Sequence, residues 1–297
     1  MSSKKVYVLM TTFNGEKFLH KQLSSIANQF GVSVRVRVND DGSSDRTMEI
    51  LKYWQAKGLI ESISLSKNLG SAQGFFHLLN QYELEFPVAL SDQDDVWEKD
   101  KLLKQLTVIK SEGPMVVAAN RRIIDLKGAN IKSEMFSAPN SLHWKNAVFE
   151  NILFGNTILM NRKAIDLVRS LSGKGLRQHD SAIYLLFSVV GQIAYIEEEL
   201  VNYRIHSGNA IGLRRQKVIW EVFVNFKNYY RQMIVVLELV LRELQPNIEF
   251  IEFGNEVASR NFLSRSFYIL RSDIYRQRSK ETFLAKTLFC IATFRLR

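Results

Sequence analysis

Short apolar runs alternate with amphipathic helical segments through the first 119 residues, and this alternation restricts the fold more than any other feature of the chain. Alternating strands and helices are typical of a parallel sheet covered by helices on both faces, so we expect an α/β fold. Arg35 and Arg37 alternate with valines in the second strand, which should therefore lie near a solvated edge. The predicted strands are residues 6–10, 34–38, 63–65, 88–91 and 115–119.

The pattern loosens after residue 119. Loops and hairpins are expected over residues 120–146, and two short strands near Ile193 and Val201. A strand at residues 156–160 and helices at residues 162–171 and 181–190 complete this part. Beyond residue 212, apolar and aromatic residues at helical spacing predict an α-helical appendage. Its longest unbroken apolar stretch, residues 233–237, is far shorter than the roughly 20 residues that cross a bilayer.

Composition fits a globular protein, because 46% of the 297 residues are hydrophobic and 24% are charged. The one cysteine, Cys290, offers no disulfide partner, and the N-terminus leads directly into the first apolar run. We therefore expect a cytoplasmic protein. The net charge of +10 is concentrated at residues 260–297, where nine Lys or Arg face two acidic residues. An anionic membrane surface, a nucleic acid or plain solvent could each face such a tail.

Three carboxylates follow the fourth predicted strand within four residues, at Asp92, Asp94 and Asp95. Like charges so close repel one another, and at least one pKa should rise unless a cation neutralises them. Mg²⁺ or Mn²⁺ would do so, and ligands of open α/β sheets bind at the carboxyl ends of strands. The sequence thus predicts a metal site here, with an acidic loop that caps the next helix as the alternative.

Polar loops also follow the other predicted strands. The first offers hydroxyls, an aromatic face and backbone donors, the second carboxylates, and the third a cation with a flexible backbone. Each loop alone is a common turn sequence. Because the carboxyl ends of parallel strands meet at one edge, the loops together predict a nucleotide diphosphate site. Their residues are Thr11, Thr12, Phe13 and Asn14; Asp40, Asp41 and Asp45; and Lys67, Asn68 and Gly70.

These motifs resemble glycosyltransferase family 2, in particular the bacterial branch that includes rhamnosyltransferases of surface polysaccharide synthesis. The resemblance covers about residues 5–212 and is most specific in Ser-Asp-Gln-Asp-Asp-Val-Trp at residues 91–97. It implies a GT-A fold, a Rossmann-like mixed sheet with a C-terminal α-helical appendage. The implied domains are a glycosyltransferase domain at 1–212, with a nucleotide-binding half at 1–119 and an acceptor half at 120–212, and a basic helical region at 213–297.

The resemblance also implies roles for individual residues. Asp180 would be the catalytic base, with His179 where the family usually has glutamate. Asp92, Asp94 and His206 would hold Mg²⁺ or Mn²⁺ with help from Asp95, and the acceptor side would include Trp97, Gly155, Asn156 and His179. The nucleotide-sugar site would comprise Thr11, Thr12, Phe13, Asn14, Glu16, Asp40, Asp41, Lys67, Asn68, Gly70, Asp92 and Gln93.

The implied reaction is a metal-dependent, inverting transfer of a sugar from dTDP-rhamnose or a UDP-hexose. The acceptor would be a hydroxyl of a lipid-linked glycan in O-antigen or capsule synthesis, at the cytoplasmic face of the inner membrane, where the basic tail would make peripheral contact. A noncatalytic nucleotide-sugar-binding module is the main alternative. A receiver-like signalling domain and a nucleic-acid-binding protein fit less well, because the helical tail does not suggest the first and no recognised motif supports the second.

Overall fold

The computed structural model describes residues 4–131, 142–148, 150–171, 176, 178–206, 234–236, 238–239, 248–259, 269 and 272–273. The chain divides into two compact units. The predicted boundary at residue 212 stays a prediction. The first unit comprises Met1–Ala138, Leu153–Gly173 and Gln192–Leu213, and the second comprises Pro139–Ile152, Lys174–Gly191 and Arg214–Arg297.

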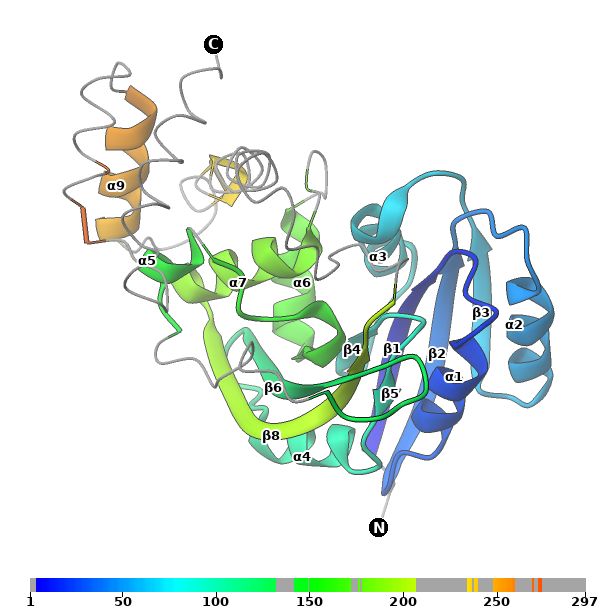
Figure 1. Ribbon diagram of the computed structural model, residues 1–297. Helices are drawn as coiled ribbons and strands as arrows, with labels where there is room; N and C mark the ends of the chain where they lie inside the picture. Colours follow the sequence, from blue (N-terminus) through cyan, green and yellow to red (C-terminus); the bar gives the residue numbers. More distant parts are fainter. Residues whose placement is uncertain are drawn as a thin grey trace. The chain divides into compact units, whose positions relative to one another are not determined.

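A mixed sheet of eight strands forms the centre of the first unit, in the order β3-β2-β1-β4-β7-β6-β8-β5 (Figure 1). The first four strands of the chain run parallel to one another. Strand β7 is antiparallel to β4 and β6, β8 is parallel to β6, and β5 is antiparallel to β8. The bounds are β1 (Lys4–Thr12), β2 (Val32–Asp40), β3 (Ile60–Leu65), β4 (Val88–Ser91), β5 (Val96–Trp97), β6 (Met115–Ile124), β7 (Leu159–Met160) and β8 (Gln192–Arg204). The expected mixed α/β sheet is confirmed.

Helices of the first unit connect these strands where the periodicity predicts them. They are α1 (Leu19–Ala27), α2 (Thr47–Ala56), α3 (Gly70–Gln81), α4 (Lys101–Val108) and α6 (Arg162–Ser170), with a short 3-10 helix η1 (Gly155–Thr157). No helix in the part of the chain that the structure describes is long and apolar enough to cross a membrane.

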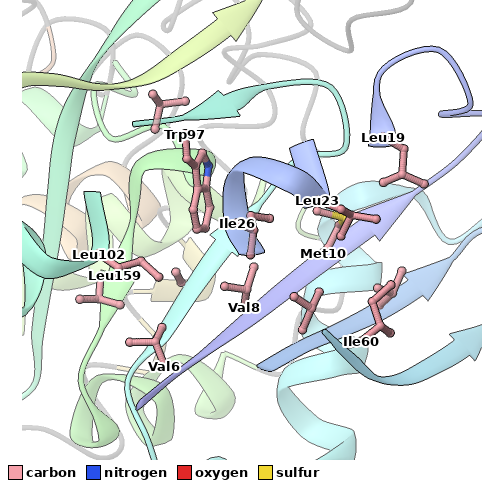
Figure 2. Close-up of a cluster of buried hydrophobic side chains, with 14 of the residues drawn as sticks. Val6, Val8, Met10, Leu19, Leu23, Ile26, Ile60, Trp97, Leu102 and Leu159 are labelled. Atoms are coloured by element: carbon pink, nitrogen blue, oxygen red, sulfur yellow. The ribbon is translucent and has the colours of Figure 1, made fainter. Parts of the chain in front are cut away.

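Strand β1 is buried on both of its faces, which explains why it reads as an unbroken apolar run. Val6, Val8 and Met10 belong to one core cluster with Leu23 of α1 and Leu102 of α4 (Figure 2). On the other face, α3 lies directly on the sheet: a β-carbon at Gly74 would come within 2.8 Å of the Thr11 side chain. The loops that follow the strands are therefore supported by a sheet packed from both sides.

Three expectations about the sheet are wrong. Strand β6 continues to Ile124, the single strand β8 replaces two short ones, and residues 155–157 form a 3-10 turn rather than the start of a strand. Strands β6 and β8 pair along most of their length, with irregular register around Asn120. Three consecutive glutamates at residues 197–199 interrupt the apolar pattern of β8 near that irregularity, so the sequence reads as two pieces.

Arg37 also departs from expectation, because it is 8% exposed rather than solvated. Its guanidinium lies over the rings of Tyr7 and Tyr82, at 4.2 and 4.4 Å from their centroids. Its Nε donates to Glu61 at 2.6 Å. Stacking on aromatic faces and a carboxylate partner let this charge be buried one strand in from the sheet edge.

The second unit is helical where the structure describes it, with α5 (Trp144–Ala147), α7 (His179–Val190) and α9 (Ile248–Ser259). Trp144 packs against Phe250 and Phe253, each ring pair being 5.5 Å apart. The predicted helical patterns at residues 216–244 and the basic tail at residues 260–297 lie largely outside the described residues. Within the appendage, residues 234–236 and 238–239 are helical, and so is α9.

Candidate functional site

The carboxyl ends of β1 to β4 place four polar loops at one edge of the sheet. Thr12 at the end of β1 pairs in register with Asp40 at the end of β2, and Asp40 pairs with Leu65 of β3. On the other side of β1, Met10 pairs with Ser91. The four loops that the sequence predicts to face one ligand thus begin side by side.

Asp40 organises the second loop from within. It is 1% exposed, and its carboxylate accepts hydrogen bonds from the hydroxyls of Thr12 and Ser43, both at 2.7 Å. The backbone amides of Ser43 and Gly42 donate to its other oxygen, at 2.9 and 3.2 Å. A buried carboxylate with four internal donors supports the loop rather than presenting oxygen atoms to a ligand.

Asp41 links the second loop to the third. Its Oδ1 accepts hydrogen bonds from the Ser66 hydroxyl at 2.9 Å and the Leu69 amide at 2.8 Å, and its Oδ2 accepts from the Gly70 amide at 2.8 Å. Between these anchors, Asn68 adopts a left-handed φ of 59°. The carboxylate thus imposes a specific shape on the segment that contains Lys67, Asn68 and Gly70.

The first loop carries an exposed aromatic ring on an ordered backbone. Phe13 is 52% exposed, which is unusual for a phenylalanine beside a buried strand. Next to it, Asn14 has a left-handed φ of 48°, and its amide N–H donates to Ser43 Oγ at 2.9 Å. Glu16 donates its amide to Asp45 and pairs with Arg46 at 3.3 Å. The ring therefore projects from a loop that is tied to the second loop.

The structure brings Asp94 and His206 together, as the sequence predicts. Nε2 of His206 lies 2.7 Å from Oδ2 of Asp94, and the histidine ring packs on Phe18 with 5.0 Å between ring centroids. The side chain of Arg204 donates to the backbone carbonyl of Asp94 at 3.1 Å. The residues at the end of β8 thus hold both the side chain and the backbone of Asp94.

Asp95 lies beneath this pair and is fully buried. It accepts hydrogen bonds from the Asn156 side-chain amide and from the backbone N–H of Arg204. Burial raises the pKa of Asp95 to about 7, and the negative charge of Asp94 adds to the rise. The expected repulsion within the acidic run is therefore present, and its cost falls on the buried carboxyl group.

Three buried cations around the acidic loop were not selected from the sequence. Besides its bond to Asp94, Arg204 donates to the carbonyls of Asp125 and Leu126, at 3.0 and 3.2 Å. Arg121 lies over the rings of Phe154 and Tyr203, and Lys101 lies 3.7 Å from the Trp97 ring centroid. Burial lowers the pKa of Lys101 to about 7. Of the three, Arg204 stands near a selected residue in the sequence, two positions before His206.

The structure corrects the expectation for Trp97, whose side chain is 3% exposed and packs in the core with Val8 and Ile26 (Figure 2). It does not face an acceptor. Gly155 and Asn156 are buried as well, with Asn156 bonded to Asp95. Asn156 thus supports the acidic loop through Asp95.

Asp180 and His179 lie in the second unit, in the first turn of α7. Oδ1 of Asp180 accepts a hydrogen bond from the Ser181 amide at 2.8 Å. The positive end of the helix dipole favours a carboxylate at this position. Burial lowers the pKa of His179, so that its neutral form is favoured.

The residues present fit a divalent ion in their chemistry. Among the described residues, no group of three or more His, Cys, Asp or Glu side chains is gathered as a metal cage. Asp94 and His206 do converge, and they offer one oxygen and one nitrogen donor. Mg²⁺ is commonly held by one or two carboxylates together with substrate phosphates, and imidazole nitrogen suits transition metals. A pair of side chains completed by a diphosphate is therefore an adequate site.

Comparison with known proteins points to one family. The model of the family described as "Glycosyl transferase family 2" matches residues 7–176. The dTDP-rhamnosyl transferase RfbG of Shigella flexneri is 24% identical over 267 residues, covering 86% of each chain. The putative teichuronic acid biosynthesis glycosyltransferase TuaG of Bacillus subtilis is 24% identical over 228 residues, covering 76% of this chain and 88% of its own.

Solved structures share the fold. Residues 1–349 of S. aureus TarS in complex with UDP-GlcNAc superpose with a TM-score of 0.60 at 17% identity, covering 98% of this chain and 80% of that one. The mannosyltransferase PcManGT of Pyrobaculum calidifontis, in complex with GDP-Man and Mn²⁺, gives a TM-score of 0.56 at 14% identity, covering 98% and 87%. The sheet described above is therefore of the GT-A type.

Proposed function

Because the chain belongs to glycosyl transferase family 2, we propose that this glycosyltransferase moves a sugar from a nucleotide diphosphate donor to a hydroxyl group of a glycan. The observation that carries the proposal is the pairing of Asp94 with His206 at the sheet edge from which the loop of Phe13 also emerges. The pair of Asp94 and His206 offers ligands for a metal-bound diphosphate, and the Phe13 ring offers a stacking surface for a base. The pathway would be surface polysaccharide synthesis, such as O-antigen or capsule.

We propose dTDP-rhamnose as the first donor to test, with UDP-hexoses next. The Shigella flexneri relative named a dTDP-rhamnosyl transferase supports the first, and the UDP-GlcNAc complex of TarS supports the second. The exposed Phe13 ring would stack on the base. Asp41 is a better partner for the base or ribose than Asp40, because Asp40 is buried and already accepts four hydrogen bonds.

The proposed chemistry is a single displacement with inversion. Asp180 accepts the proton of the acceptor hydroxyl, whose oxygen forms a bond to the anomeric carbon. The bond from that carbon to the diphosphate oxygen breaks, and the nucleoside diphosphate leaves with the electron pair. When bound by Asp94 and His206, Mg²⁺ or Mn²⁺ would supply charge neutralisation to the diphosphate. Arg204 keeps Asp94 in position by holding its backbone carbonyl.

The proposed acceptor is a lipid-linked glycan at the cytoplasmic face of the inner membrane. Nine basic residues against two acidic ones at residues 260–297 support peripheral contact with an anionic surface. This tail lies almost wholly outside the described residues, and the contact is proposed from its charge in the sequence.

A donor panel tests the function. Binding and hydrolysis of dTDP-rhamnose, UDP-GlcNAc, UDP-glucose and GDP-mannose would be measured with and without Mn²⁺, then transfer to lipid-linked acceptors. We expect one donor to bind tightly only with the metal. Failure of every donor to bind would reject the proposal, and binding without hydrolysis or transfer would favour a noncatalytic module.

Replacement of the proposed base is the companion test. Asp180→Asn should lower the transfer rate by roughly 100-fold to 10,000-fold, because the amide cannot accept the hydroxyl proton. Donor affinity should be preserved, since the change keeps the size of the side chain. A variant with unchanged transfer would exclude Asp180 as the base.

A further inference from the structure

Gln93 connects the acidic loop to the loop after β1. Its Oε1 accepts a hydrogen bond from the backbone N–H of Phe13 at 2.9 Å, and its Nε2 donates to the backbone carbonyl of Phe13 at 2.9 Å. An N–H can only donate and a carbonyl can only accept, so these partners fix the orientation of the amide. The side chain thus holds both polar groups of one residue, as a neighbouring strand would.

The chain also leaves room for this contact. A β-carbon at Gly15 would lie 2.3 Å from Gln93 Oε1 and 2.7 Å from its Cδ. The flexible end of Gln93 would be the part to yield, because a β-carbon does not approach other atoms that closely. A methyl group at residue 15 should therefore push the amide away from Phe13 while leaving Gln93 itself intact.

Phe13 and Asp94 stand at the two ends of this connection. The Phe13 ring is 52% exposed and belongs to the first loop. Asp94 is adjacent to Gln93 and is held from the opposite side by His206 and Arg204. A nucleotide diphosphate whose base stacks on Phe13 and whose phosphates lie by Asp94 would touch both loops that Gln93 joins.

We propose that Gln93 is a positioning residue that couples the base platform at Phe13 to the acidic loop, so that the two ends of the donor bind cooperatively. The inference rests on the proposed function. It gives Gln93 a role in addition to the expected contact with the nucleotide sugar, because one donor and one acceptor of the amide are used on Phe13. Under this assignment, loss of Gln93 uncouples the ring from the phosphate site without removing either.

A double-mutant cycle tests the coupling, with UDP and dTDP as probes and calorimetry in Mn²⁺ as the readout. In the wild-type chain, Phe13→Ala should weaken binding on the order of tenfold, as loss of one stacked base does. Gln93→Met keeps the side-chain length but removes both hydrogen bonds. In this background, Phe13→Ala should weaken nucleotide binding no more than about twofold. In the Gly15→Ala background, Phe13→Ala should likewise weaken nucleotide binding less than it does in the wild-type chain.

Gln29 provides a matched control within the same unit. Its Oε1 accepts from the Leu102 amide at 3.0 Å, and its Nε2 donates to the Glu98 carbonyl at 2.8 Å. Gln29→Met therefore removes the same kind of contact away from Phe13. In the Gln29→Met background, Phe13→Ala should weaken nucleotide binding as much as it does in the wild-type chain.

The outcomes distinguish failure of the coupling through Gln93 from failure of the proposed function. If Phe13→Ala costs as much beside Gln93→Met and Gly15→Ala as beside Gln29→Met, Gln93 is only a loop brace and the coupling is refuted. If the wild-type chain binds neither probe, nor GDP, the proposed function fails first and this inference fails with it. A reduced cost in both the Gln93→Met and Gly15→Ala backgrounds supports the coupling, even where one of these variants is unstable.

Discussion

Two acidic loops leave the same edge of the sheet, yet their carboxylates have opposite surroundings. After β2, Asp40 and Asp41 are surrounded by hydroxyl and amide donors from their own and neighbouring loops. After β4, Asp94 meets a histidine and Asp95 is buried among polar and cationic groups. Asp40, enclosed by four neutral internal donors, builds its loop, whereas Asp94, next to a histidine, is placed for ionic chemistry.

The sharpest test of this contrast is Asp94→Ala. The Asp94 side chain is 13% exposed and contacts His206. The variant should lose more than about 100-fold in transfer and lose its response to Mn²⁺. Loss of a residue behind a metal ligand typically costs 10-fold to about 100-fold, so loss of a ligand should cost more. Steady-state rates across a Mn²⁺ titration provide the check. Unchanged metal dependence would place Asp94 with the structural carboxylates.

A substitution in the other loop should show the reverse pattern. Asp40→Ala leaves four donors without their acceptor, and we expect a loss of about 3 kcal/mol in the free energy of unfolding. Asp41→Ala, at a less buried position, should cost about 1 kcal/mol. Urea denaturation measures both. Equal stability of Asp40→Ala and the wild type would remove the structural role assigned to Asp40.

A pH-dependent effect concerns Lys101, which is buried and close enough to Asp95 to interact electrostatically with it. Its folded pKa is about 7, whereas the unfolded amine keeps a proton up to its usual 10.5. Between these values the unfolded state binds more protons, so this residue makes stability rise with pH. Lys101→Met should flatten the rise in unfolding free energy between pH 7 and 10. Denaturation curves of both proteins at the two pH values give the comparison, and parallel slopes would mean that Lys101 is solvated when charged.

Periodicity and turn chemistry predict the first half of the sheet well. Strands β1 and β4 contain apolar runs, and polar loops follow the parallel strands directly, so the shared edge of these loops could be inferred. That β8 forms one continuous strand could not be inferred, because the register irregularity near Asn120 and a run of glutamates interrupt its apolar pattern. The local spacing of residues does not show which distant segments pair with one another.

Within the site, it was easier to predict which residues lie there than what each side chain does. Asp94 and His206 meet although 112 positions separate them, which the motif resemblance anticipated. Trp97 follows the acidic loop in sequence, yet its side chain enters the core, because β5 is a short strand whose successive residues point to opposite faces. Sequence shows that an aromatic residue is near the loop, but only the strand geometry shows which way it points.

The two-residue ladder between β5 and β8 sets the alignment of the metal candidates. Val96 pairs with Asn202 and Trp97 with Val201, directly after the acidic loop and shortly before His206. Because β8 is also held by its long pairing with β6, a slip of this ladder by one residue would reverse which side chain of β5 faces the core and shift Asp94 relative to His206. The two candidate metal ligands are thus kept in phase by a few backbone hydrogen bonds, so we expect an inserted or deleted residue there to abolish transfer while sparing the rest of the sheet.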